Sequence, residues 1–232
     1  MKVAVVTGAS RGIGRAVAAG LAKDGYDLAL SARGREDLEK ARDEILSDSP
    51  SVAVAVYPVD LKDSRNVSDM VDDAVKRFGR IDLLFNNAGI FHGGTVDLPF
   101  EQFEEMIDIN LKAAFRVLQK TVPVMRKQKS GIIINLSSRS GKIAKPTSGA
   151  YAASKFGLVG LSEALYREVT ADGIRVTALC PGWVDTDMAA MSGLPPEEMV
   201  QTADIVATVR WLANLSPAAC VKDLVIESFR QV

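Results

Sequence analysis

The chain opens with Lys2-Val3-Ala4-Val5-Val6-Thr7-Gly8-Ala9-Ser10-Arg11-Gly12-Ile13-Gly14, in which a short apolar run passes directly into a turn with three glycines. The residues that follow, from Arg15 to Lys23, favour a helix. Glycines let such a turn tighten and let the backbone approach a pyrophosphate, which then lies at the helix N-terminus, where unpaired N–H groups and the helix dipole favour anions. The glycine spacing and the position after the first strand favour a dinucleotide-binding turn over an ordinary strand-to-helix connection.

The alternation of strand and helix continues along the rest of the chain. Longer amphipathic stretches separate short apolar runs, which predict strands near 3–7, 27–31, 52–59, 82–87, 131–137, 174–180 and 222–227. Alternating β and α elements indicate an α/β fold with a parallel sheet covered on both faces. No repeat, low-complexity segment or linker interrupts the pattern, so we predict a single domain over residues 1–232.

Composition limits the classes of function. The 232 residues are 47% hydrophobic and 25% charged, with a formal net charge of -1, which argues against nucleic-acid binding or a polybasic membrane surface. Two cysteines, Cys180 and Cys220, are too few for a disulfide framework. A single histidine, His92, is too few for a zinc site of the usual His/Cys kind. Because no leader-like segment or run of ~18 apolar residues is present, we expect a cytoplasmic protein that binds no metal.

A second stretch, from Ser138 to Lys155, can place a hydroxyl, a phenol and an ammonium around one substrate oxygen. Tyr151 and Lys155 are four residues apart on an expected helix, so their side chains share one face. Free tyrosine titrates near ~10, and a nearby ammonium would bring its pKa toward neutral pH. Ser138 follows a buried strand, whose C-terminal end is where ligands bind in open α/β sheets. Tyr-x-x-x-Lys also occurs by chance in helices, but this context favours an active site.

Five motifs, in this order and spacing, resemble those of the short-chain dehydrogenase/reductase family: Thr7-Gly8-x-x-x-Gly12-Ile13-Gly14, Asn86-Asn87-Ala88-Gly89, Ser138, Tyr151-x-x-x-Lys155 and Pro181-Gly182. The resemblance extends from Lys2 to about Thr186. It implies a Rossmann-type doubly wound fold with a seven-stranded parallel sheet flanked by helices on both faces. It also implies nicotinamide-dependent oxidation or reduction.

The resemblance implies roles for four catalytic residues. Tyr151 would protonate the carbonyl oxygen while hydride arrives from the nicotinamide, and would act as the base in the reverse direction. Ser138 would hydrogen-bond the same oxygen. Lys155 would lower the pKa of the phenol and bind the nicotinamide ribose. Asn110 would hold a water that connects the lysine to solvent, unless it is only a polar break in a helix.

The resemblance also implies cofactor contacts at the ends of the strands. Asp60 would contact the adenine, although it could instead be only the N-cap of the following helix, and Thr186 would contact the carboxamide. The full predicted set is Gly8, Ser10, Arg11, Gly12, Ile13, Gly14, Arg33, Asp60, Leu61, Asn87, Ala88, Gly89, Tyr151, Lys155, Pro181, Gly182 and Thr186.

The end of the second strand predicts which nicotinamide is bound. NAD-binding chains usually place an acid there for the ribose 2′-hydroxyl, whereas a 2′-phosphate requires a guanidinium in its place. Ala32 stands at the position of the acid, Arg33 follows it, and Arg11 in the glycine-rich turn could reach the same phosphate. We therefore predict NADP(H); the alternative is that both arginines are ordinary surface charges.

Two long helices indicate a homo-oligomer. The helix expected around 101–125 is apolar over more than one face, and the next long helix is rich in glycine and alanine, which permits close approach of another helix. Because these two helices commonly pair across a dimer interface in the family, the resemblance implies a homodimer or a homotetramer. Packing within one chain is the alternative.

The substrate pocket is predicted around a variable lid at about 187–202, which contains Met188, Met191, Met199 and the break Gly193-Leu194-Pro195-Pro196. Methionines adapt to irregular apolar shapes. Further residues that flank the motifs could line the pocket and indicate a mostly apolar carbonyl or alcohol: Phe91, His92, Ser140, Ile143 and Trp183. His92 is interpreted as a loop residue. The C-terminal strand lacks the Gly-Gly pair that commonly follows it in the family, which weakens the prediction of a tetramer.

Three functions compete. The first is an NADPH-dependent carbonyl reductase or alcohol dehydrogenase that acts on a small or medium soluble compound. The second is a 3-oxoacyl-[acyl-carrier-protein] reductase, whose acidic partner would need a basic docking pair; the aligned positions hold Lys129 and Asp172, of which only the first is basic. The third is a non-catalytic NADP(H)-binding sensor. Such proteins usually lose the tyrosine or the lysine, and this chain retains both, so an enzyme of the first kind is favoured.

Overall fold

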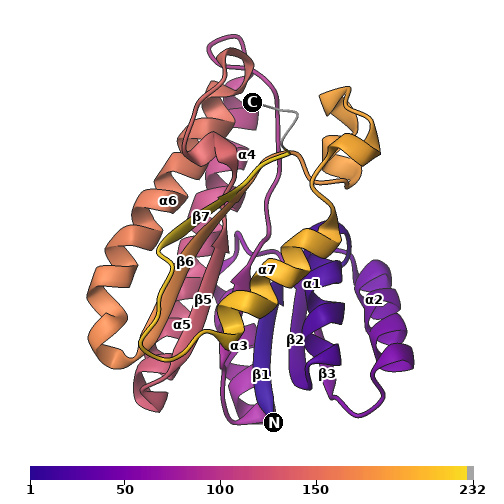
Figure 1. Cartoon of the computed structure of the whole chain (residues 1–232), viewed down its shortest axis with the longest axis vertical. Coiled ribbons are helices and arrows are strands. Elements are labelled where there is room, and N and C mark those ends of the chain that lie inside the picture. Colours follow the sequence, from indigo (N-terminus) through magenta and orange to yellow (C-terminus); the bar gives the residue numbers. More distant parts are fainter. Residues whose placement is uncertain (229–232) are drawn as a thin grey trace.

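A computed structural model describes residues 1–228, apart from the side chain of Met191. Within this range, seven parallel strands form one sheet in the order β3-β2-β1-β4-β5-β6-β7 (Figure 1). The strands are β1 (Lys2–Thr7), β2 (Tyr26–Ala32), β3 (Val54–Pro58), β4 (Leu83–Asn86), β5 (Gly131–Leu136), β6 (Ile174–Pro181) and β7 (Asp223–Ile226). Each predicted strand is present within two residues of its expected bounds. The last four residues of the predicted domain and the Met191 side chain of the predicted lid lie outside the described part.

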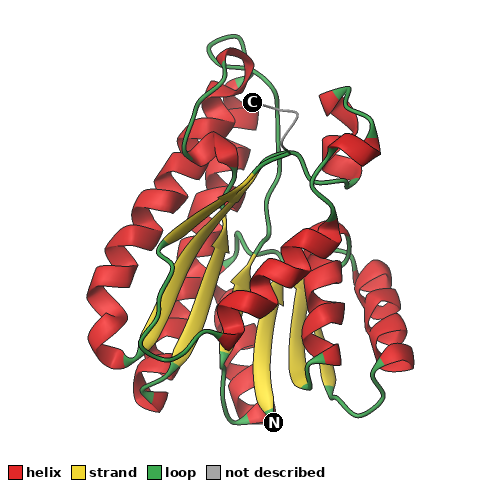
Figure 2. Cartoon of the chain, viewed as in Figure 1, coloured by secondary structure: helices red, strands yellow, loops and turns green. Residues whose placement is uncertain are grey.

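Helices cover both faces of the sheet, as the alternation predicts (Figure 2). They are α1 (Gly12–Lys23), α2 (Arg35–Asp48), α3 (Ser64–Phe78), α4 (Phe100–Ile107), α5 (Ala114–Gln128), α6 (Gly149–Val169) and α7 (Thr202–Asn214). One core packs α1, α2 and α7 on the sheet, and a second packs α3, α5 and part of α6 on the opposite face. In β1, Ala4 and Val6 belong to the first core and Val5 to the second. Because both faces are buried, the strand is a continuous apolar run.

The α3 helix illustrates how local sequence sets the ends of an element. Asp63 is its N-cap and accepts a hydrogen bond from the Arg65 N–H at 2.7 Å, and Gly79 ends it in the left-handed region at a φ of +78°. The helix buries a stripe with helical spacing, Val67, Met70, Val71 and Ala74. Asp60 is therefore not the N-cap, so that alternative is wrong: its side chain accepts from the Lys62 N–H at 2.9 Å within the preceding turn.

The long helix expected around 101–125 is not one continuous α-helix. A π-helical segment, Asp108–Ala113, lies between α4 and α5. The interruption explains why the helical pattern is apolar over more than one face, because α4 and α5 bury different sides. Met106 of α4 packs with Tyr151 in a small cluster beside the ends of the strands, whereas Val117 and Leu118 of α5 pack on the sheet.

The strand order reverses at β1, which lies between β2 and β4. Connections leave this point in opposite directions and open a crevice at the carboxyl ends of the strands, which is where ligands bind in such sheets. Five further one- or two-turn 3-10 helices lie in the described part of the chain, at Arg139–Gly141 (η2), Pro146–Ser148, Thr170–Asp172, Asp187–Ser192 and Pro196–Glu198. Within residues 1–228, no helix is both long enough and apolar enough to cross a membrane.

Candidate active site

The glycine-rich turn after β1 is tight enough that side chains would not fit. Gly8 and Gly12 have φ angles of +65° and +53°, in the left-handed region that favours glycine. A Cβ on Gly14 would lie 2.2 Å from the Gly8 carbonyl oxygen, so the first turn of α1 packs directly on the loop. The helix begins at Gly12, three residues earlier than predicted, because the last two glycines belong to its first turn.

Two polar side chains fasten this turn to the end of β4. The Asn87 amide donates to the carbonyl oxygens of Thr7 and Gly8 at 2.8 and 3.1 Å. In return, Thr7 Oγ1 accepts from the backbone N–H groups of Asn87 and Ala88 at 2.9 and 3.0 Å. The two predicted cofactor loops therefore form one unit at the switch point of the sheet.

The start of α1 fits the diphosphate of a dinucleotide. Among the described residues, no side chain caps this helix, and its first turn contains no acid, so its N–H groups and dipole remain available to an anion. Arg33 is exposed immediately after β2. Arg11 is also exposed, and its guanidinium lies 3.5 Å from the carboxylate of Asp187. The two arginines thus stand at the same edge of the sheet as the glycine-rich turn.

Ser138 and Tyr151 are brought together by β5 and α6. Ser138 follows β5 in an extended conformation, and its Oγ accepts from the Ser140 N–H at 3.0 Å. Tyr151 lies in the first turn of α6 with its side chain buried. The Ser138 side chain lies close enough to the phenol to lower its pKa, so the hydroxyl and the phenol can meet at one oxygen atom of a substrate.

Lys155 lies one turn further along α6 and is 3% exposed. Its Nζ donates to the Leu136 carbonyl oxygen at 2.9 Å and lies 5.7 Å from the centre of the Tyr151 ring. Burial lowers the pKa of Lys155 to about 8. Burial raises the pKa of Tyr151 to about 12, and the nearby Ser138 side chain opposes this shift. The expected lowering of the phenol pKa by the ammonium is therefore wrong for the protein alone, since desolvation dominates.

Asn110 is fully buried in the π-helical segment and is part of the same site. Its side chain accepts from the Ile90 N–H at 2.8 Å, and donates to the Ile90 carbonyl at 2.9 Å and to Ser154 Oγ at 3.0 Å. A Cβ on Gly89 would lie 3.2 Å from Asn110 Oδ1 and 3.5 Å from Lys155 Nζ. The asparagine and the lysine thus converge on one glycine, and the expected polar break in the helix is also present.

A buried polar network below the site was not anticipated from the sequence. Asn86 donates to Asn135 Oδ1 at 3.1 Å, and Asn135 donates to Ser162 Oγ at 2.9 Å. Thr7 Oγ1 lies 3.4 Å from Asn86 Oδ1. The network links β1, β4, β5 and α6. Its sequence signals are Thr7 and Asn86, which belong to two of the motifs, and Asn135, a polar residue inside an otherwise apolar run.

The remaining predicted cofactor residues line the same edge. The Gly182 N–H donates to the Ile226 carbonyl at 2.7 Å, which ties the end of β6 to β7. Thr186 Cγ2 would lie 3.4 Å from a Cβ on Gly12, so the segment after β6 lies against the glycine-rich turn. Leu61 and Pro181 are buried, and Ser10 and Ile13 are half-buried.

Aromatic rings line one wall beside Tyr151. The ring centre of Phe91 lies 4.9 Å from that of Tyr151 and 6.2 Å from that of Trp183, with interplanar angles of 74° in both pairs. His92 does not reach the phenol: its Nε2 lies 3.0 Å from Glu105 Oε2. Ser140 is half-buried, whereas Ile143 is 60% exposed.

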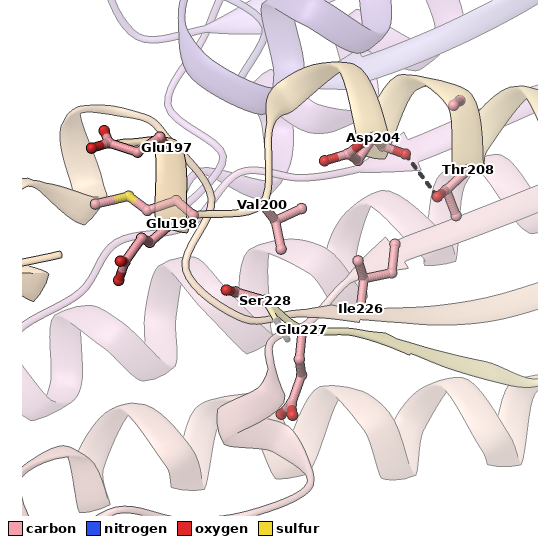
Figure 3. A pocket seen from close by; sticks show the side chains of 10 residues that line it. Glu197, Glu198, Val200, Asp204, Thr208, Ile226, Glu227 and Ser228 are labelled. Atoms are coloured by element: carbon pink, nitrogen blue, oxygen red, sulfur yellow. Dashed lines mark hydrogen bonds between the residues drawn. The ribbon is translucent and has the colours of Figure 1, made fainter. Parts of the chain in front are cut away.

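A cavity of about 720 Å³ lies elsewhere, between the lid, the start of α7 and the end of β7 (Figure 3). Its described lining contains Glu197, Glu198, Asp204 and Glu227 but none of the four candidate catalytic residues. We locate the active site by the convergence of the chemical groups at the carboxyl ends of the strands, and not by this cavity.

Comparison with known proteins gives a consistent result. A family model described as short chain dehydrogenase matches residues 2–195. The chain is 38% identical to the 3-oxoacyl-[acyl-carrier-protein] reductase FabG of Staphylococcus aureus over 224 residues, which cover 92% of this chain and 91% of the relative. A crystal structure of a betaketoacyl-[ACP] reductase (FabG) from Bacteroides thetaiotaomicron is similar at 41% identity and a TM-score of 0.88, with 99% and 97% of the two chains covered. An alcohol dehydrogenase from the archaeon Thermococcus sibiricus, complexed with 5-hydroxy-NADP, is similar at 32% identity and a TM-score of 0.92, with 100% and 98% covered.

Proposed function

The chain belongs to the short-chain dehydrogenase family and is an oxidoreductase of CH–OH and C=O groups, and we propose that it is an NADP(H)-dependent carbonyl reductase or hydroxy-compound dehydrogenase with Tyr151 as general acid and base. The observation that carries this proposal is the proximity of Ser138 to Tyr151, one helical turn from Lys155 and beside the glycine-rich turn. The residues 187–202 would form the lid of this single domain.

Each side chain has a defined task in the proposed reaction. When bound, the nicotinamide supplies the hydride for reduction or accepts it for oxidation. Ser138 and Tyr151 hold the substrate oxygen between them, and Tyr151 gives it a proton. A phenol with a pKa of about 12 is protonated at neutral pH and is ready to act as the acid. Lys155, with a pKa of about 8, can replace near neutral pH the proton that Tyr151 gives up. Asn110 would hold the water that connects Lys155 to solvent.

We propose NADP(H) as the preferred cofactor. The end of β2 carries Ala32 where an acid would repel a 2′-phosphate, and the exposed Arg33 follows it. Arg11 supports the same preference from the glycine-rich turn, although it must first leave Asp187, with which it is paired. Two solved relatives were determined with NADP or an NADP derivative bound, including ElxO at 28% identity and a TM-score of 0.89.

Reduction of a 3-oxoacyl group on acyl-carrier protein is the second candidate, because the FabG relatives have 38% and 41% identity. The charges at the aligned docking positions argue for a small soluble substrate instead. Lys129 Nζ donates to Asp172 Oδ1 at 2.9 Å, and Arg126 Nε donates to the other oxygen of the same carboxylate at 3.0 Å. Arg126 also donates to Glu168 Oε1 at 2.6 Å, so the cluster has two cations and two carboxylates and attracts an acidic carrier weakly. The apolar wall of Phe91 and Trp183 favours a mostly apolar carbonyl compound.

We also propose a cytoplasmic homo-oligomer. Phe115 on α5 and Phe156 on α6 are 44% and 45% exposed, and they lie on the two long helices that are predicted to pair across an interface. Part of the small-residue surface of α6 serves packing within the chain, since a Cβ on Gly157 would lie 2.9 Å from Leu111 Cδ2. At Gly160, in contrast, no described atom lies within 4 Å of an added Cβ, so that part of the helix faces outward.

The test follows NADPH absorbance with a panel of ketones, aldehydes, oxo-acids and 3-oxoacyl thioesters, with NADH assayed in parallel. Each 3-oxoacyl chain is offered both as a free thioester and on acyl-carrier protein. Turnover of a compact set of free carbonyl compounds is the expected result. A rate at least tenfold higher with the carrier-bound form would favour the second candidate. Tight NADPH binding with no turnover would favour the non-catalytic sensor.

A further inference from the structure

The short η2 turn that follows Ser138 packs closely on α6. A Cβ on Gly141 would lie 2.6 Å from Ser137 Oγ and 2.8 Å from the Lys155 carbonyl oxygen. Ser137 Oγ also donates to this carbonyl at 3.0 Å. These contacts fix the side of the turn that faces α6. The contacts on its opposite side, which faces β7, then determine how far Ser138 can move relative to Tyr151.

Two ion pairs hold this opposite side of the turn to β7. Arg139, the residue after Ser138, places its Nε 3.0 Å from Glu227 Oε1, and Lys142 pairs with Asp223 at the other end of the strand. The side chains of Arg139 and Glu227 are 18% and 28% exposed. Water screens such a pair less than one like Arg11–Asp187, in which both side chains are more than three-quarters exposed.

Glu227 is directed to this contact and not to the acidic groups of the neighbouring cavity. Figure 3 shows its carboxylate turned away from Glu197 and Asp204, although all three residues line the same cavity. The backbone that carries Glu227 is also held in place. Glu227 follows Ile226, the last residue of β7, whose carbonyl accepts from the Gly182 N–H at 2.7 Å. It lies in the C-terminal segment that lacks the expected Gly-Gly pair.

We propose that Glu227 is a positioning residue that, through Arg139, holds the η2 turn so that Ser138 stays beside Tyr151. This inference rests on the proposed function, because the position of Ser138 affects turnover only if Ser138 and Tyr151 act on the same oxygen. Small displacements of a group that binds the reacting atoms reduce turnover far more than they reduce folding stability.

Steady-state kinetics of Glu227→Gln test the proposal. We expect kcat to fall about three- to tenfold, with the KM for NADPH unchanged, since the loss is one of alignment and not of cofactor binding. Asp223→Asn is the matched control, because it removes the equivalent charge from the same strand but at the end of the turn remote from Ser138. Its kcat should stay within twofold of wild type. Equal falls in both variants would mean that β7 supports the fold only, and would overturn the proposal.

A double-mutant cycle with Arg139→Gln tests whether the effect passes through the pair. If it does, Arg139→Gln/Glu227→Gln should be no slower than the slower single variant. Multiplied losses in the double variant would show two independent effects and would contradict the proposal.

Hydrogen exchange separates this inference from the proposed function. Peptides covering 137–143 should exchange faster in Glu227→Gln than in wild type, while those covering 149–169 should not change. If wild type turned over no carbonyl compound, the proposed function would fail, but this measurement would still show whether Glu227 orders the turn. Unchanged exchange at 137–143 would overturn the positioning role whatever the activity.

Discussion

At the scale of single residues, Tyr151 combines deep burial with the proximity of one polar side chain, Ser138. Tyr151→Phe should lower kcat by about 10²–10⁴-fold, because removal of a positioned proton donor costs this much. Fluorescence titration should give an NADPH affinity within about twofold of wild type. Undiminished turnover in this variant would disprove the assignment of the general acid.

The buried ammonium of Lys155 predicts a dependence of stability on pH. Its pKa is lowered from 10.5 to about 8 in the folded protein, so between these values the unfolded chain binds more protons. The contribution of Lys155 to the free energy of unfolding therefore increases as pH rises through 8. Denaturant titrations of the cofactor-free protein should show this increase between pH 8 and about 10, relative to Lys155→Met. An identical pH dependence in the two proteins would contradict the assigned burial effect.

Arg33 tests the choice of cofactor. Arg33→Ala should weaken NADPH binding by about tenfold or more, because one charge-assisted contact to phosphate is lost, while NADH binding should stay nearly constant. Isothermal titration with both nucleotides measures the difference. Arg35→Ala is a suitable control, since Arg35 is also exposed but pairs with Glu39 on α2. Equal weakening of both nucleotides would show that Arg33 does not bind the 2′-phosphate.

At the scale of secondary-structure elements, the network of Asn86, Asn135 and Ser162 joins strands and helix beneath the site. Asn135→Ala should lower the free energy of unfolding by about 2–3 kcal/mol, because buried partners lose hydrogen bonds that water cannot replace. Urea denaturation measures this loss. Asn214→Ala, at an exposed position of α7, should change it by less than about 0.5 kcal/mol.

The strands could be anticipated because each strand of a doubly covered parallel sheet must be apolar on both faces. The motif residues could be located because glycine, serine, tyrosine and lysine recur at fixed spacings within single segments. The Asn86–Asn135 and Arg139–Glu227 contacts could not, since they join residues 49 and 88 positions apart in separate segments. The direction of the phenol pKa shift could not be predicted for a similar reason. The spacing of Tyr151 and Lys155 shows that a cation is near, but it does not show how strongly burial desolvates the phenol.

At the scale of the whole molecule, the exposed aromatic residues of α5 and α6 predict association. Phe115→Glu/Phe156→Glu should convert a dimer into monomers, as measured by light scattering coupled to size exclusion, because burying two unpaired carboxylates in an interface is costly. Trp211→Glu changes an equally exposed aromatic residue on α7 and should leave the α5–α6 dimer intact. A monomeric wild-type protein would contradict the proposed homo-oligomer.

The π-helical segment also limits how the length of this chain can change over evolution. Each residue of an α-helix advances its direction by roughly 100°, and the segment Asp108–Ala113 sets the rotation of α4 relative to α5. Deletion of one residue here would produce a more regular helix but would turn α4 about its axis by about that angle. Met106 would leave its place beside Tyr151, and Asn110 would no longer face Ile90. Insertions and deletions should therefore be tolerated at the loop tips of this molecule and selected against within this irregular helical turn.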